Sequence, residues 1–184
     1  MNIDLMSFYK NIPHQVHEFV HSRNFDTILV GMNPGHDWRF VDTDYFLTDF
    51  AKGWFSDRGI ILKPKAALFK ADANPKRSAY RIHSDSQIND TGINFILSGA
   101  GEMQWVEPTH AEINDVNDQG TVYPMYDNAS DIKILDKWSG TCGIVNVKVP
   151  HRILVTSSVP RICFSLRPDL TKCQIYFNQA CDLI

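Results

Sequence analysis

Two histidines and one aspartate have the residue types and spacing that could carry chemistry in this sequence. The segment SAYRIHSDSQ holds His83 and Asp85 two positions apart, and His151 follows in the segment VKVPHRILV. Side chains two positions apart on a β-strand project from the same face, so His83 and Asp85 would lie side by side. A neutral imidazole and a carboxylate in that arrangement can bind one divalent metal ion.

His151 would complete a set of three metal ligands. Two histidines and one carboxylate form a facial triad, which leaves three coordination positions on ferrous iron for a bidentate co-substrate and dioxygen. Arg161 begins another strand-like run after His151, and a guanidinium on an adjacent strand can hold a carboxylate through two hydrogen bonds. We therefore interpret His83, Asp85 and His151 as candidate metal ligands and Arg161 as a candidate anion clamp.

The run from Arg161 onward alternates in a way that supports this interpretation. If Arg161 points inward, then Cys163, Ser165 and Arg167 share its face. The intervening apolar residues would pack outside against other elements; they are Ile162, Phe164 and Leu166. Arg167 is therefore an alternative clamp.

A second motif offers a different metal and a different reaction. Residues 17–21 read HEFVH, in which His17 and His21 on one helix could share zinc while Glu18 serves as the general base of a peptidase. Only sixteen residues precede His17, whereas a metallopeptidase helix normally follows a supporting sheet. The simpler interpretation is an amphipathic helix with Phe19 and Val20 packed and the histidines at the surface.

Short segments rich in β-branched and aromatic residues predict most of the secondary structure. Helical spacing predicts helices only at 13–25 and 44–54, and residues 31–46 and 109–143 are expected to form surface loops near the site. The predicted strands are 27–32, 60–62, 66–69, 93–97, 144–149, 153–156 and 162–166. These elements predict a mainly β (α+β) fold, a sandwich, barrel or jelly roll with flanking helices.

Composition and charge limit the possible partners. The length of 184 residues suits one domain, and 18 basic against 21 acidic residues give a net charge of -3. Nucleic acid is not favoured as a partner, because such a chain has no broad positive field. The four cysteines form no C-x-x-C pair, and neither a signal peptide nor a membrane-length apolar run is seen. A soluble protein of a reducing compartment, the cytoplasm, is expected.

The order H-x-D, distal histidine and then arginine resembles the Fe(II)/2-oxoglutarate-dependent dioxygenase superfamily, in particular its prolyl-hydroxylase-like branch. The segment INFILSGAGEMQWVEP is similar to the strand, turn and next strand that follow H-x-D in that family, and PHRILV to its distal-histidine strand. The resemblance spans about residues 60–167. It implies a double-stranded β-helix, the jelly roll of the cupins, as one domain over residues 1–184.

The resemblance also implies an activity and roles for particular residues. His83, Asp85 and His151 would ligate Fe(II), Arg161 would bind the distal carboxylate of 2-oxoglutarate, and Asn94 would contact that co-substrate. With O2, the reaction would hydroxylate a substrate C–H bond and release succinate and CO2. The substrate stays open among a protein side chain, an amino acid and a small metabolite, as does the oligomeric state. The alternative is a cupin-like binding module without oxygenase activity, and a zinc peptidase is the less favoured one.

Overall fold

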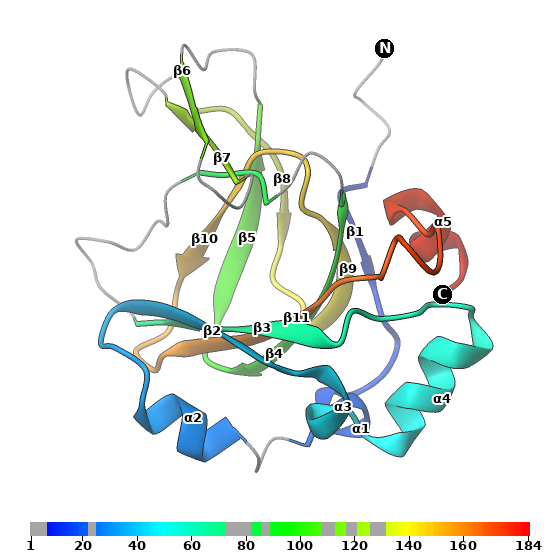
Figure 1. Cartoon of the computed structure of the whole chain (residues 1–184). Coiled ribbons are helices and arrows are strands. Elements are labelled where there is room, and N and C mark those ends of the chain that lie inside the picture. Colours follow the sequence, from blue (N-terminus) through cyan, green and yellow to red (C-terminus); the bar gives the residue numbers. More distant parts are fainter. Residues whose placement is uncertain are drawn as a thin grey trace.

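The computed structural model describes residues 7–21, 25–72, 82–85, 89–107, 113–116, 121–125 and 132–184. Two antiparallel β-sheets dominate it, and short helices lie along one side (Figure 1). The strands are β1 (Tyr9–Asn11), β2 (His36–Asp42), β3 (Lys65–Ala71), β4 (Thr91–Ser98), β5 (Gly101–Val106), β6 (Ile113–Val116), β7 (Val122–Met125), β8 (Ile134–Trp138), β9 (Cys142–Asn146), β10 (His151–Val155) and β11 (Arg161–Leu166). The helices are α1 (Val16–Phe19), α2 (Asp26–Val30), α3 (Thr43–Phe46), α4 (Asp49–Asp57) and α5 (Phe177–Asp182).

The order of the strands identifies the architecture. The larger sheet runs β1-β9-β4-β11-β3-β2, the smaller sheet runs β10-β5-β8, and residues 82–85 join the smaller sheet through a bridge to β10. From β3 to β11 successive segments alternate between the two sheets, except at the step from β5 to β8, which is interrupted by the hairpin of β6 and β7. This alternation is that of a double-stranded β-helix, so the predicted mainly β, jelly-roll fold is confirmed.

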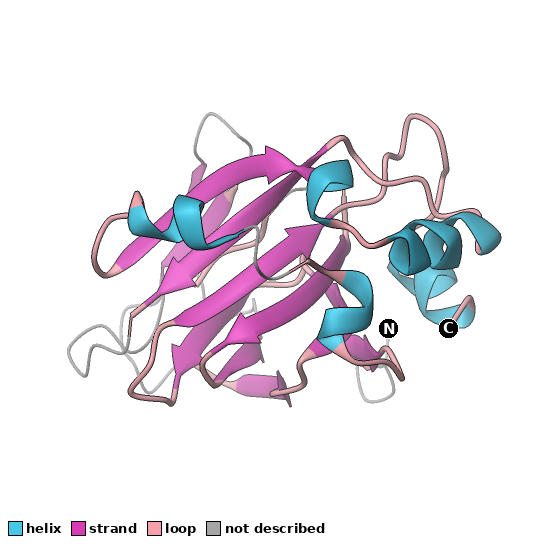
Figure 2. Cartoon of the chain, turned by 90° about the horizontal axis from the view of Figure 1, so that it is seen from below, coloured by secondary structure: helices cyan, strands magenta, loops and turns pink. Residues whose placement is uncertain are grey.

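Two apolar clusters hold the layers together. One lies between the larger sheet and the helices that cover it (Figure 2). It includes Phe19, Phe95 and Phe164, which are fully buried. Ile162, Phe164 and Leu166 all belong to this cluster, which confirms the alternation predicted for that strand. The other cluster lies between the two sheets and is centred on Trp105, with Phe8, Met103, Trp138, Val145 and Val147 around it. The smaller sheet is therefore fixed against the larger one directly beside β10.

The N-terminal half differs from the sequence prediction in three places. Residues 27–32 were predicted as a strand, but residues 26–30 form the helix α2. The helix predicted at 13–25 is only the four residues of α1. The helix predicted at 44–54 is split into α3 and α4, because Thr48 adopts an extended conformation and its side chain caps α4 by accepting from the Ala51 N–H.

The predicted loops also contain regular structure. Residues 36–42 of the expected loop 31–46 form β2, which pairs with β3 along its whole length and leaves Trp38 and Phe40 partly exposed at the edge of the sheet. The expected excursion 109–143 contains β6, β7 and β8, and the last of these is a member of the smaller sheet. The predicted strand 60–62 is reduced to a single bridge between Leu62 and Pro168. Local polarity and turn residues concealed these pairings, which depend on distant partners.

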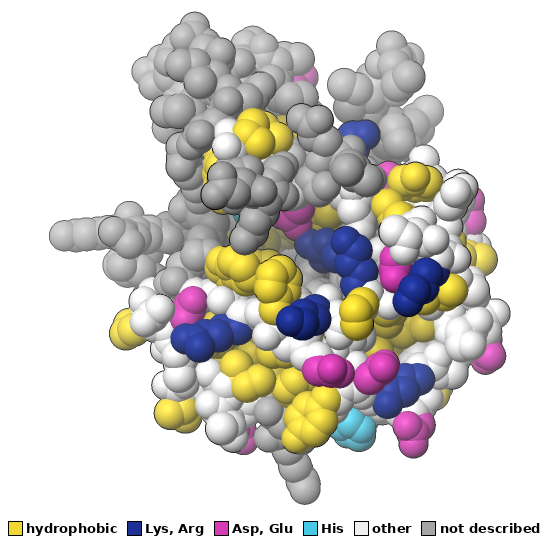
Figure 3. All heavy atoms as spheres, in the orientation of Figure 1, with side chains coloured by type: hydrophobic (Ala, Val, Ile, Leu, Met, Phe, Trp, Pro, Cys, Tyr) yellow, Lys and Arg dark blue, Asp and Glu magenta, His cyan; other side chains and the backbone are white. Residues whose placement is uncertain are grey.

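In the described part of the chain, no helix is long and apolar enough to cross a membrane. On the face shown in Figure 3, the basic side chains of the described residues lie scattered among acidic and hydrophobic ones.

The turn between β4 and β5 should tolerate no side chain at Gly99. Gly99 has φ +70°, and a Cβ there would lie 2.5 Å from the Pro160 carbonyl oxygen. We expect Gly99→Ala to lower the free energy of unfolding by about 1–3 kcal/mol or more, measured by urea denaturation. Gly53→Ala is the matched control: Gly53 lies in α4 with nothing within 4 Å of a Cβ, so alanine should stabilise the protein by about 0.5–1 kcal/mol. Equal stabilities of the two variants would contradict this prediction.

Candidate metal centre and anion clamp

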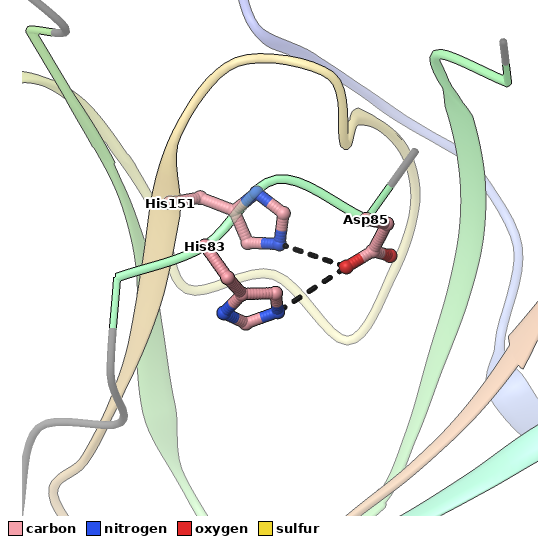
Figure 4. A group of neighbouring side chains, drawn as sticks. All are labelled: His83, Asp85 and His151. Carbon is pink, nitrogen blue, oxygen red and sulfur yellow. Dashed lines mark ion pairs between the residues drawn. The ribbon is translucent and has the colours of Figure 1, made fainter. Parts of the chain in front are cut away.

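His83, Asp85 and His151 lie together in the folded chain. Their ligand atoms lie within 4.8 Å of one another, and in the described residues they are the one group of three or more His, Cys, Asp or Glu side chains placed to hold a metal ion. The three side chains point toward one another from two adjacent segments (Figure 4). Asp85 Oδ1 lies 3.2 Å from His83 Nε2 and 3.7 Å from His151 Nε2.

Backbone pairing brings the two histidines together. The His83 N–H donates to the His151 carbonyl at 2.9 Å, and the His151 N–H donates to the His83 carbonyl at 2.8 Å. Their rings are 4.6 Å apart between centroids. The Asp85 N–H donates to the Val147 carbonyl at 3.0 Å. The short segment 83–85 is therefore bonded through its backbone at both His83 and Asp85. Alternation then sends His83 and Asp85 to one face, as predicted.

The orientation of His151 leaves its Nε2 atom available as a ligand. His151 Nδ1 lies 2.9 Å from the Val149 carbonyl oxygen, and because a carbonyl only accepts, Nδ1 must carry the proton. The lone pair on Nε2 therefore faces Asp85. Burial, together with the nearby His83, lowers the pKa of His151 to about 4. The ring is thus held in the neutral form that a metal requires.

Asp85 is ionised despite its surroundings. Burial opposes the charge, but the hydrogen bond from His83 and the charge of Arg167 outweigh it, and they hold the pKa of the Asp85 carboxyl well below its usual range. Arg167 Nη2 donates to Asp85 Oδ2. An ionised carboxylate beside two imidazoles is a donor set that suits a divalent metal such as Fe(II), so the residues present fit the group.

Arg161 occupies the inner face of β11, at some distance from the three candidate ligands. It is 4% exposed, and its Nε atom has no hydrogen-bond partner among the described residues. No carboxylate of the described chain lies within ion-pair distance of it. Burial raises the pKa of the adjacent Cys163 thiol in spite of the charge on Arg161, so that thiol is neutral and does not balance the guanidinium. Arg161 is thus a buried cation suited to an anionic ligand.

Two glycines leave the space that Arg161 fills. A Cβ at Gly101 would lie 2.8 Å from Arg161 Cδ, and a Cβ at Gly99 would lie 2.8 Å from its backbone. Gly101 pairs with Val155, and four residues farther along the same strand Trp105 pairs with His151. Arg161 and His151 therefore adjoin positions on β5, Gly101 and Trp105, that are about 13 Å apart along the strand. A ligand between them would reach both only if it carried binding groups at its two ends.

The other predicted residues are placed as follows. Asn94 is buried, and its Oδ1 accepts a 2.5 Å hydrogen bond from Ser165 Oγ. The alternative zinc residues do not form a site: α1 ends at Phe19, Val20 bridges Leu47 in extended conformation, and Glu18 accepts from the Gln15 N–H. His17 and His21 are therefore not on successive turns of one helix.

Sequence reasoning missed two parts of this region. It assigned no role to Gly92 or Gly101, whose missing side chains make room for the two arginines. It also gave no indication that Arg167 contacts Asp85, although strand alternation had placed Arg167 and Ser165 on the inner face. Tyr123 of the β6–β7 hairpin lies beside His83, with the ring centroids 6.0 Å apart.

No protein-family model matches this sequence, and no curated protein is significantly similar to it. Among solved structures, the chain is similar to oxalate decarboxylase of Bacillus subtilis, in a study of its Mn(II) centres and in a structure at pH 4.6. In both, the TM-score is 0.37 and the identity 13%, over 74% of this chain and 26% of the other. A variant of the same enzyme gives 0.38 and 14%, over 77% and 29%. This chain spans about a quarter of the length of those proteins, and a likeness at this level carries no argument about chemistry.

Removal of one imidazole should abolish tight metal binding. Titration with Co(II), a spectroscopic substitute for Fe(II), should give at least about a 100-fold weaker Kd for His151→Ala than for wild type, because loss of a ligand should exceed the 10–100-fold effect of losing a ligand's own partner. His17→Ala should bind Co(II) as wild type does. Unchanged affinity in His151→Ala, or a loss in His17→Ala, would contradict the assignment.

Proposed function

We propose that this protein is a non-haem Fe(II), 2-oxoglutarate-dependent dioxygenase that hydroxylates a substrate C–H bond. One observation carries the proposal: a His-Asp-His cluster faces the same interior as a buried arginine that has no acidic partner among the described residues. The cluster supplies three protein ligands and Arg161 supplies an anion site, in the chain order of the family that the sequence resembles. The residues that would hold Fe(II) are His83, Asp85 and His151.

The proposed roles follow from the contacts of each side chain. His151, with its proton held on Nδ1 by Val149, would present Nε2 to the metal, and His83 would do so from the paired segment. Arg161 would bind the distal carboxylate of 2-oxoglutarate, because its guanidinium is buried and its Nε lacks a partner. Asn94 would use its side-chain NH2 group toward the co-substrate, since Ser165 already occupies its oxygen.

The chemistry is balanced by the co-substrate. Bound Fe(II) would supply the activation of O2 that couples decarboxylation of 2-oxoglutarate to oxidation of the substrate. The carbon–hydrogen bond, 2-oxoglutarate and O2 give the hydroxylated product, succinate and CO2, with one oxygen atom in the new hydroxyl and one in succinate. The protein would position the reactants and exclude water from the site. Trp105, the strand partner of His151, is fully buried in the apolar cluster between the sheets.

The primary substrate is proposed only as a class. A protein side chain, an amino acid and a small metabolite are all compatible with an interior of this kind, while the mixed surface charge gives no support to a nucleic acid. The cytoplasm is the proposed location.

The test is anaerobic titration of metal-free protein with Fe(II) and 2-oxoglutarate, which should give a weak visible charge-transfer band that requires both on one metal. In air the same protein should form succinate and CO2 in equal amounts. Arg161→Gln should raise the KM for 2-oxoglutarate by about 10–100-fold, because it loses charge-assisted hydrogen bonds of about 1.5–3 kcal/mol.

Arg152→Gln is the matched control for Arg161→Gln. Arg152 follows His151 and donates from Nε to Gln104 Oε1 at 2.9 Å, on the opposite face of β10, so its removal should leave the KM for 2-oxoglutarate unchanged. A wild-type protein that binds Fe(II) yet gives neither the band nor succinate would favour the cupin-like binding module instead.

A further inference from the structure

Both terminal nitrogens of Arg167 donate hydrogen bonds to protein oxygens. Arg167 lies directly after β11, and its Nη2 donates to Asp85 Oδ2. Its Nη1 donates to Ser165 Oγ at 2.6 Å and to the Leu166 carbonyl oxygen at 2.9 Å. The guanidinium is therefore held by its own strand on one side and holds Asp85 on the other.

Neighbouring residues of β11 and β4 hold the Arg167 guanidinium in place. Ser165 Oγ accepts a hydrogen bond from Arg167 and donates one to Asn94 Oδ1 at 2.5 Å, so the hydroxyl is held between β11 and β4. On β4, a Cβ at Gly92 would lie 2.9 Å from Val147 Cγ1, 3.0 Å from Val145 Cγ2 and 3.1 Å from Arg167 Nη1. Glycine at this position thus leaves the space that the guanidinium occupies.

Arg167 divides the two oxygens of Asp85 between two tasks. Oδ2 accepts from Arg167, whereas Oδ1 faces His83 Nε2 and His151 Nε2. We propose that Arg167 is a positioning residue that fixes Asp85 as a one-oxygen metal ligand, with Ser165 and Gly92 keeping the guanidinium in place. This inference rests on the metal site of the proposed function and assigns distinct tasks to the two arginines.

The contacts favour Arg161 over Arg167 as the proposed co-substrate clamp. Both terminal nitrogens of Arg167 already donate to protein oxygens, one of them to a candidate metal ligand. Withdrawing it would leave an ionised carboxylate partly buried without its cation, which is costly. Arg161, whose Nε lacks a partner among the described residues, has no such commitment.

The experiment uses Co(II) alone as the probe, with its Kd and its visible d–d spectrum as readouts. Arg167→Met should weaken Co(II) binding by about 10–100-fold, the usual effect of losing a ligand's hydrogen-bond partner, and should alter the spectrum because Asp85 can turn. Arg167→Lys should recover part of the affinity, since an ammonium can still donate to Oδ2. Arg161→Gln should retain wild-type Co(II) affinity while losing 2-oxoglutarate, and Arg152→Gln should retain both.

Gly92→Ala is a second variant that tests the same role in case Arg167→Met does not fold. The new methyl group would crowd Val147 and Val145 as well as Nη1. Gly92→Ala should therefore weaken Co(II) binding in the same direction, with circular dichroism showing that the fold is retained. Wild-type protein that binds no Co(II) would overturn the proposed metal site itself. Wild-type protein that binds Co(II), with equal Kd and spectrum in Arg167→Lys, Gly92→Ala and any folded Arg167→Met, would overturn the positioning role alone.

Discussion

The reciprocal pair of backbone hydrogen bonds between His83 and His151 is the interaction on which the candidate centre depends. It joins two segments far apart in the sequence and brings their rings to 4.6 Å between centroids, tilted by 51° to each other. Strand alternation then places Asp85 on the same side. The pairing is possible because β10 is already fixed by β5 along its whole length, and β5 by the cluster around Trp105. The apolar packing between the sheets thus fixes β10, the strand to which the segment with His83 and Asp85 is hydrogen-bonded.

Electrostatics completes what the pairing begins. A carboxylate in partly buried surroundings loses hydration, and a charge-assisted hydrogen bond returns only about 1.5–3 kcal/mol of that loss. Asp85 has such a bond from Arg167 on one oxygen and two imidazoles near the other, so it is ionised with both oxygens occupied. His151 is kept neutral by burial. The centre therefore combines one carboxylate and two imidazole rings, and Arg167 contacts the carboxylate on Oδ2, the oxygen that does not face the imidazoles.

The sequence predicted those features that depend on local alternation. H-x-D on a strand, the inward face from Arg161 to Arg167 and the apolar residues between them all follow from a two-residue period. Features that depend on distant partners were not predictable in the same way. Residues 27–32 contain three β-branched residues, yet 27–30 lie in the helix α2, and 36–42 follow a turn-rich stretch yet pair with β3. The contact between Arg167 and Asp85 joins residues 82 positions apart, and nothing local at either residue indicates it before both sheets have closed.

The two arginines show how one strand can serve stability and binding at once. Arg167 is balanced by Asp85, so it can be buried in the fold without a ligand. Arg161 is enclosed beside Gly99 and Gly101 with a neutral thiol next to it, and a buried cation without a partner is destabilising. Under the proposed function, a carboxylate bound beside Arg161 would offset part of this cost, and the ligand-bound protein would gain stability by mass action. Among the described residues the Nε atom of Arg161 has no hydrogen-bond partner. An anionic ligand would account for a charged side chain at a position where stability alone favours a hydrophobic one.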